Sequence, residues 1–257
     1  MYNLSFISKE NFELHVSQTL ATYNDTIQSI DLNSFNSNVI DPIKLLFDKS
    51  VYKQTFESVI TQEIARQRDK SNNNAIGYFH QNMFRYIKHC TVPKEYWDVI
   101  YDDGEKSIYV EMKNKHNTMN SASSQKTYIK LQNQALQDKE CLCYLVEAIA
   151  PVSRDITWKC SVDGQRVENE RIRRVSIDKF YAEVTGIKNS FYQICRQLPE
   201  TINELILKDS VRTVQKDTVI EELKRKKPDT LTALYLLAFE TYEGFSDLVK
   251  NPVRSLL

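Results

Sequence analysis

Residues 96–113 decide the fold, and they read Tyr-Trp-Asp-Val-Ile-Tyr-Asp-Asp-Gly-Glu-Lys-Ser-Ile-Tyr-Val-Glu-Met-Lys. Two runs rich in aromatic and β-branched residues, Tyr96–Ile100 and Ser107–Lys113, flank the pair Asp103-Gly104. Such runs are typical of β-strands, and an Asp-Gly pair tolerates the positive φ angles of a tight turn. The pattern therefore predicts a β-hairpin.

The predicted hairpin gathers two acidic side chains and a lysine. With Asp103-Gly104 as a two-residue loop, Asp98 lies opposite Tyr109. Because side chains alternate between the faces of a strand, Asp98, Glu111 and Lys113 then share one face. Asp98 and Glu111 become diagonal neighbours, roughly 7–8 Å apart. A four-residue loop keeps this arrangement, whereas a three-residue loop puts Asp98 on the opposite face.

Two carboxylates and a lysine on one face suit metal-dependent hydrolysis of a phosphodiester. Carboxylates bind Mg²⁺, which polarises the phosphate and lowers the pKa of a bound water. Lys113 can orient the attacking water or offset developing negative charge. The alternative is that Glu111 and Lys113 belong to an ordinary solvated strand face.

The sequence around the hairpin also resembles a known family. Asp-x₁₂-Glu-x-Lys is similar to the PD-(D/E)xK nuclease motif, although Trp97 replaces its proline. Residues 110–126 closely resemble a family of type II restriction endonucleases that cut GGNCC and GGWCC sites, as does the stretch Ile76–Gln81. The resemblance covers about residues 55–135. It implies Mg²⁺-dependent cleavage of double-stranded DNA, with the catalytic residues Asp98, Glu111 and Lys113.

The resemblance also concerns an acid on a preceding helix. Residues 50–68 form a predicted helix in which Glu63 falls within the apolar stripe. Nucleases of this superfamily commonly contribute an acid from the helix before the hairpin, which implies Glu63 as a metal ligand beside Asp98 and Glu111. The alternative is a surface ion pair with Arg66, three residues further along the helix.

A second predicted helix, 75–89, carries three residues of interest. Gln81 is implied by the resemblance as a group that supports the catalytic residues. His80 lies on the inner stripe, where a hydrogen-bonded interior histidine is favoured over a ligand. Gly77 costs about 1 kcal/mol in a helix compared with Ala, so it permits either close packing or close approach of DNA.

Two segments are candidates for reading DNA. Polar side chains after the hairpin, with one lysine of the next helix, can donate to phosphates and base edges: Lys115, His116, Asn117, Thr118, Asn120, Ser121 and Lys126. Residues 154–174 are the most arginine-rich stretch, and arginine reads guanine through two hydrogen bonds; the candidates are Arg154, Arg166, Arg171, Arg173 and Arg174. The alternatives are a solvated loop that caps the next helix and arginines that pair with neighbouring acids.

Hydrophobic periodicity predicts an α/β fold with a mixed central β-sheet flanked by helices, and the resemblance implies that this fold is of the restriction-endonuclease type. Strands are expected at 141–149, 157–162 and 171–177. Helices are expected at 8–32, 50–68, 75–89, 123–137, 188–208, 217–225 and 230–245, with a polar loop at 69–74. We expect one domain over 1–257, in which a catalytic sheet at 96–185 lies between a helical N-terminal region (1–95) and a helical C-terminal region (186–257).

Composition limits the remaining possibilities. The 34 basic and 34 acidic residues cancel, which counts against non-specific coating of nucleic acid but allows a specific nuclease. No apolar run spans a membrane and no signal peptide is visible, so we expect a cytoplasmic bacterial protein with free thiols. Because a palindromic site has two scissile phosphates, we expect a homodimer on DNA. The rival functions are a repair or junction-resolving PD-(D/E)xK nuclease and an inactive DNA-binding module.

Overall fold

The computed structural model describes residues 2–116, 118–208, 215–227 and 229–240. They belong to two compact units: the first contains residues 1–21 and 74–211, and the second contains residues 22–73 and 212–257. Helix α4 (Phe56–Met83) contributes residues to both. Across the described residues, none of the helices is both long enough and apolar enough to cross a membrane.

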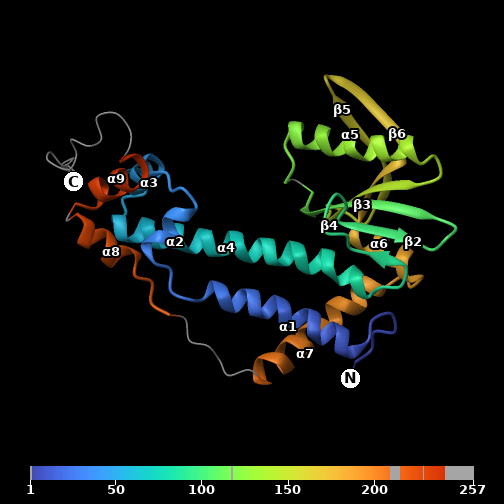
Figure 1. Cartoon of the computed structure of the whole chain (residues 1–257), viewed down its shortest axis with the longest axis horizontal. Coiled ribbons are helices and arrows are strands. Elements are labelled where there is room, and N and C mark those ends of the chain that lie inside the picture. Colours follow the sequence, from blue (N-terminus) through green and yellow to red (C-terminus); the bar gives the residue numbers. More distant parts are fainter. Residues whose placement is uncertain (1, 117, 209–214, 228, 241–257) are drawn as a thin grey trace. The chain divides into compact units, whose positions relative to one another are not determined.

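A six-stranded mixed sheet forms the centre of the first unit (Figure 1). Its order is β1-β2-β3-β4-β6-β5, with parallel β3–β4 and β4–β6 pairs and antiparallel pairs elsewhere. The strands are β1 (Cys90–Thr91), β2 (Val99–Asp102), β3 (Ser107–Lys115), β4 (Leu142–Ile149), β5 (Asp155–Val162) and β6 (Gln165–Ser176). The apolar strand β4 lies inside the sheet, as its sequence predicts. The expected mixed α/β architecture is confirmed.

The β2–β3 hairpin forms with a longer loop than predicted. Asp102 pairs with Ser107, so the loop is the four residues Asp103–Lys106. Oδ1 of Asp103 accepts two backbone N–H groups inside the loop, at 3.0 and 2.9 Å, and Gly104 adopts a φ of 90°. The pairing is therefore shifted by two residues from the predicted one, which leaves every side chain on its predicted face.

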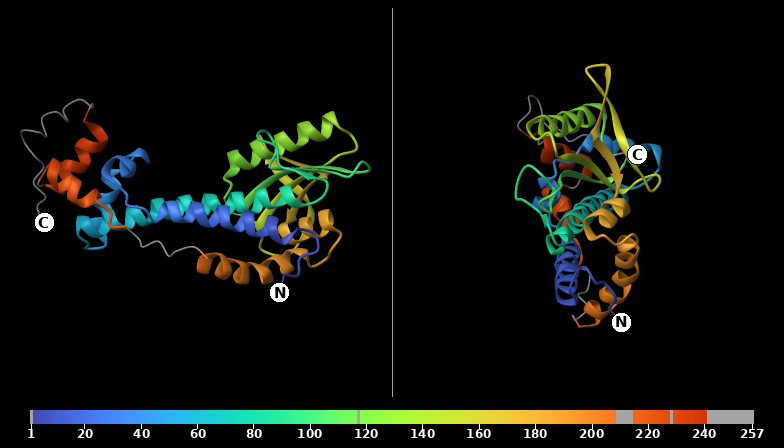
Figure 2. Two further views of the ribbon diagram at one scale, coloured as in Figure 1. Left: turned by 60° about the horizontal axis from the view of Figure 1, so that its bottom comes forward. Right: turned by 90° about the vertical axis from the view of Figure 1, so that its right-hand side faces the viewer.

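Helices cover both faces of the sheet (Figure 1). Helix α5 (Ser121–Gln137) packs on one face, where Tyr128 and Leu131 meet Leu145 and Trp158. The other face is covered by residues of α1 (Lys9–Thr26), the short 3₁₀ helix η1 (Phe84–Tyr86), α6 (Ile177–Thr185) and α7 (Ser190–Lys208). Figure 2 shows the β5–β6 hairpin, in yellow, extending beyond the other strands. The pair Asp163-Gly164 forms the turn between these two strands, since Val162 pairs with Gln165.

The second unit is helical. It contains α2 (Leu32–Ser37), α3 (Pro42–Val51), α8 (Val219–Lys226), α9 (Thr230–Phe239) and residues 56–73 of α4. Phe35, Leu45, Ile60, Leu223 and Leu234 share its core. Asp41 caps α3, with Pro42 at the first helical position, where proline is favoured.

Several predicted boundaries are wrong for local reasons. The expected loop 69–74 is helical within α4, because it contains no proline or glycine and Asn73 bonds to Asp69 one turn earlier at 2.8 Å. Helix α5 begins at Ser121 rather than at residue 123, because Asn120 caps it and the Asn120 Oδ1 accepts the Ser123 N–H at 2.8 Å. Helix α6 was not predicted. The expected extension of the last helix to 245 lies partly outside the described residues.

Candidate active site

Asp98 lies immediately before β2 and is held against β3. Its backbone N–H donates to the Val110 carbonyl at 3.0 Å, and its Oδ2 accepts the Met112 N–H at 2.6 Å. Its own carbonyl oxygen accepts the Gln81 side-chain N–H, from α4, at 3.2 Å. These three hydrogen bonds fix the position of Asp98. Because two of them go to Val110 and Met112, the neighbours of Glu111 on β3, Asp98 lies beside Glu111.

Glu111 is the centre of the cluster. It lies in the middle of β3, on the sheet face that α5 covers, and its side chain is 16% exposed. Oε1 accepts Lys113 Nζ at 2.7 Å, and Oε2 accepts Lys130 Nζ at 2.7 Å. The structure therefore brings Asp98, Glu111 and Lys113 together, and it adds a lysine from α5.

Lys130 is the one member of this cluster that was not predicted from the sequence. Its ammonium group also bonds to the Tyr96 carbonyl oxygen and lies 4.3 Å from the centroid of the Trp97 ring. The sequence held one signal: Lys130 follows the buried Thr127 by three positions and precedes the buried Leu131. It therefore lies at the edge of the inward stripe of α5.

The two carboxyl groups differ in acidity. Burial raises the pKa of Asp98, the Met112 N–H lowers it and the nearby Glu111 raises it again, with a net increase. Burial also raises the pKa of Glu111, but hydrogen bonds from Lys113 and Lys130 outweigh it, so that this pKa is lowered. Glu111 is thus the firmly ionised group, whereas Asp98 is a partly buried carboxyl group to which the described residues give one hydrogen bond, from Met112. A divalent cation that bound both would relieve the mutual repulsion of the two acids.

The donor set fits a small, oxygen-preferring cation such as Mg²⁺. Two adjacent carboxylates are the usual protein share of such a site, because Mg²⁺ keeps several water ligands. Within the described stretches of the chain, no group of three His, Cys, Asp or Glu residues is arranged to hold a metal. A cation here would therefore depend on Asp98 and Glu111 together with water or substrate oxygens.

Glu63 belongs to the second unit and has partners of its own. Its carboxylate accepts Arg66 Nε at 2.7 Å and Arg66 Nη2 at 2.5 Å, and Gln67 Nε2 lies 3.3 Å from it. These bonds match the alternative interpretation of an ion pair with Arg66. We therefore leave Glu63 out of the candidate active site.

The candidate DNA-reading loop follows β3 directly. Lys115 and His116 are exposed at the end of that strand, and Thr118 and Asn120 are exposed before α5. Ser121 begins α5, and Lys126 is exposed on it. Asn117 lies outside the described residues. The loop caps the helix through Asn120, and its exposed side chains follow the catalytic strand directly.

Four of the five candidate arginines have partners within the protein. Arg154 and Arg174 both bond to Glu147, whose side chain is fully buried on β4. Arg171 donates to the carbonyl oxygens of Ala135, Asp138 and Lys139 at 2.7–3.0 Å, and Arg173 bonds to Asp155 at 2.5 Å. Arg166 is exposed beside the turn of the β5–β6 hairpin.

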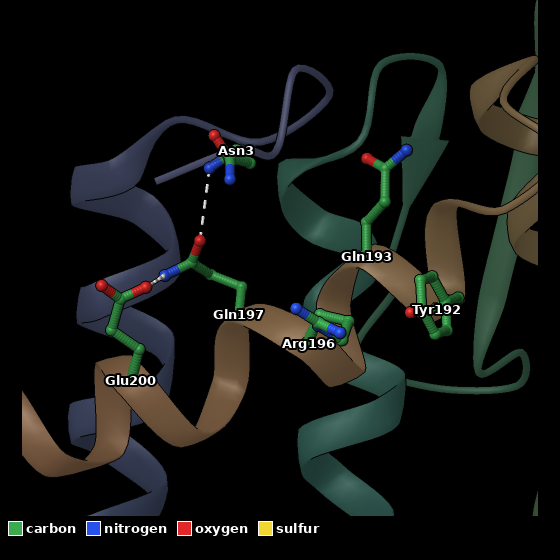
Figure 3. A pocket seen from close by; sticks show the side chains of 6 residues that line it. All are labelled: Asn3, Tyr192, Gln193, Arg196, Gln197 and Glu200. Atoms are coloured by element: carbon green, nitrogen blue, oxygen red, sulfur yellow. Dashed lines mark hydrogen bonds between the residues drawn. The ribbon is translucent and has the colours of Figure 1, made fainter. Parts of the chain in front are cut away.

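A separate polar pocket of about 420 Å³ lies where α7 meets the N-terminal segment (Figure 3). It is lined by Asn3, Tyr192, Gln193, Arg196, Gln197 and Glu200. Gln197 bridges the Asn3 N–H, at 3.2 Å, and the Glu200 carboxylate, also at 3.2 Å. The pocket contains none of the residues of the Asp98–Glu111 cluster.

Comparison with known proteins identifies the family of this chain. Residues 4–207 match the family described as Eco47II restriction endonuclease. The type II restriction enzyme Sau96I of Staphylococcus aureus is 30% identical over 213 residues, which cover 79% of this chain and 81% of that enzyme. The type II restriction enzyme Eco47II of Escherichia coli is 26% identical over 212 residues, covering 79% and 88%. The chain therefore belongs to the Eco47II restriction endonuclease family.

Proposed function

We propose that this protein is a Mg²⁺-dependent type II restriction endonuclease that hydrolyses double-stranded DNA at a short palindromic site of the GGNCC or GGWCC type. The observation that carries the proposal is the convergence of Asp98, Glu111 and Lys113 on one face of the β2–β3 hairpin. The two relatives are type II restriction enzymes by name, and the sequence motif resembles that of PD-(D/E)xK nucleases.

The residues divide the chemistry between them. Asp98 and Glu111 would hold Mg²⁺, which would polarise the scissile phosphate and lower the pKa of a bound water. Gln81 keeps Asp98 in place through its carbonyl oxygen. Lys113 contributes a positive charge at the phosphate, where it orients the attacking water or offsets the charge of the transition state.

DNA reading is assigned to two exposed regions. The first is the segment from Lys115 to Lys126, whose exposed polar and basic side chains continue from the catalytic strand. The second is Arg166 beside the turn of the β5–β6 hairpin. Arg154, Arg171, Arg173 and Arg174 are engaged within the protein, so a role in base reading would require them to exchange these partners for DNA.

A two-fold dimer on DNA follows from the substrate. A palindrome presents two equivalent phosphates on opposite strands, and one copy of the Asp98–Glu111–Lys113 cluster serves one phosphate at a time. We propose that the helical segment after Lys188 supplies the dimer contact. Sedimentation with a cognate duplex and Ca²⁺ in place of Mg²⁺ measures the stoichiometry, and one chain per duplex would argue against it.

The function is tested by digesting plasmid DNA with purified protein and Mg²⁺, followed by run-off sequencing of the ends. A fixed set of fragments whose ends share a GGNCC-type sequence is expected. Cleavage without sequence preference, or confined to branched DNA, would favour a repair or junction-resolving nuclease. Binding without any metal-dependent cleavage would favour an inactive DNA-binding module. Glu111→Gln, which keeps the size of the side chain, is the matched negative control.

A further inference from the structure

Lys130 is anchored in the candidate active site by four contacts. Its ammonium group donates to Glu111 Oε2 at 2.7 Å and to the Tyr96 carbonyl oxygen. It lies over two aromatic rings, 4.3 Å from the centroid of Trp97 and 5.3 Å from that of Tyr96. A cation over an aromatic face gains further electrostatic stabilisation. The position of this charge is therefore fixed by the fold.

Lys113 is held much less firmly. The described residues give its ammonium group one partner, Glu111 Oε1 at 2.7 Å. The two side chains are about equally exposed, 29% for Lys113 and 26% for Lys130, so the difference between them lies in the number of partners. It can turn from Glu111 toward a bound phosphate by rotating its own side chain, whereas Lys130 would give up the Tyr96 carbonyl and both ring contacts. The two lysines flank one carboxylate but differ in freedom.

We propose that Lys130 is a positioning residue, the fixed counterion of Glu111, which keeps that carboxylate oriented while Lys113 turns to the substrate. The proposal rests on the function proposed above and adds a division of labour between the two lysines. Without Lys130, Lys113 would be the remaining ammonium partner of a buried carboxylate. It would then stay on Glu111, because a buried charge without a partner is costly.

The same charge opposes a cation at Glu111. Lys130 and a bound divalent ion would lie on one carboxylate and repel each other across a few ångströms of partly buried space. Removing Lys130 should therefore tighten binding of the ion while slowing cleavage. A general loss of structure would weaken both, so the opposite directions identify the positioning role.

The test compares Lys130→Met with Lys130→Arg and with the control Lys179→Met. Methionine fills the space over the rings without the charge. Lys179 is exposed on α6, which packs on the sheet face opposite to α5, so its replacement makes the same change in net charge away from the cluster. For Lys130→Met, kcat should fall about tenfold or more with little change in KM for DNA, and Ca²⁺ should bind about tenfold more tightly in calorimetry without DNA. Lys130→Arg should recover some of both effects, and Lys179→Met should match wild type.

Two results would overturn the proposal. The first is a wild-type kcat in Lys130→Met. The second is a decrease in kcat, Ca²⁺ affinity and melting temperature together, which would show that Lys130 is needed only for the stability of the fold. Failure of the proposed function looks different, because Glu111→Gln would then match wild type in every nuclease assay. Since the Ca²⁺ titration needs no cleavage, it tests Lys130 in either case.

Discussion

Asp98 and Met112 are joined by a 2.6 Å hydrogen bond from the backbone N–H of Met112 to Oδ2 of Asp98. Met112, the residue that follows Glu111, thus fixes the carboxylate that we propose acts with Glu111. The bond crosses from the segment before β2 to β3, so the hairpin itself sets the spacing of the two acids. It also lowers the pKa of Asp98 against the larger effect of burial, which raises it.

Asp98→Asn isolates the charge of this carboxylate from its hydrogen bond. The asparagine oxygen can still accept the Met112 N–H, so folding should be preserved, but the neutral amide is a poor ligand for Mg²⁺. We expect cleavage to fall below detection, with DNA affinity in Ca²⁺ within a few-fold of wild type. Cleavage near the wild-type rate would remove Asp98 from the site. Glu111→Ala should behave in the same way.

Glu63→Ala separates the two interpretations of that residue. If the ion pair with Arg66 is its whole role, the cleavage rate should be unchanged and the free energy of unfolding should fall by about 1 kcal/mol, since the pair is partly exposed. Steady-state cleavage and urea denaturation measure the two quantities. A clear loss of cleavage in a variant of normal stability would restore Glu63 as a metal ligand.

The hairpin could be predicted because its signals are local. Asp103-Gly104 marks the turn, and a register error of two residues leaves Glu111 and Lys113 on the predicted face. Lys130 could not be predicted in the same way, because it meets Glu111 only when α5 packs on the sheet. The arginines of 154–174 show the converse. Their number suggests contacts with DNA. Two of them instead bond to Glu147, which in the sequence is a single charged residue within an apolar strand.

His80 should make the first unit sensitive to mild acid. Burial and, less strongly, the nearby His15 lower the pKa of His80 to about 4, whereas an unfolded histidine titrates near 6.5. Between these two pH values the unfolded chain binds more protons at His80 than the folded protein does. The free energy of unfolding therefore decreases as the pH falls. The His80 contribution is complete above about pH 6.5 and is lost toward pH 4, at up to about 1.4 kcal/mol per pH unit.

Urea denaturation at pH 7 and pH 5 measures this loss of stability. His80→Gln carries no titratable group at that position and should flatten the pH dependence. The pKa of His15 is also lowered, mainly by burial, so some slope should remain in that variant. An unchanged slope in His80→Gln would show that His80 does not titrate in this range.

Gly77 tests whether DNA approaches α4. A Cβ added there would meet no atom within 4 Å, so close packing does not require the glycine. Gly77→Ala should raise the free energy of unfolding by about 1 kcal/mol. If DNA approaches the helix here, one turn before Gln81, then Gly77→Ala should weaken cognate binding and Gly77→Leu should weaken it more. Equal DNA affinity in all three proteins would leave Gly77 without a role in binding.

Glu147→Gln and Arg166→Ala should separate structural arginine contacts from DNA reading. Glu147 is fully buried between Arg154 and Arg174, and loss of its charge leaves two guanidinium groups without a counterion, which typically costs about 3–5 kcal/mol. Glu147→Gln should therefore lower the melting temperature sharply.

Arg166 is exposed, so Arg166→Ala should melt like wild type while losing about 1–3 kcal/mol of preference for the cognate site. Calorimetry and competition binding with a one-base-pair variant duplex measure the two effects, and unchanged site preference in Arg166→Ala would move base reading to the segment from Lys115 to Lys126.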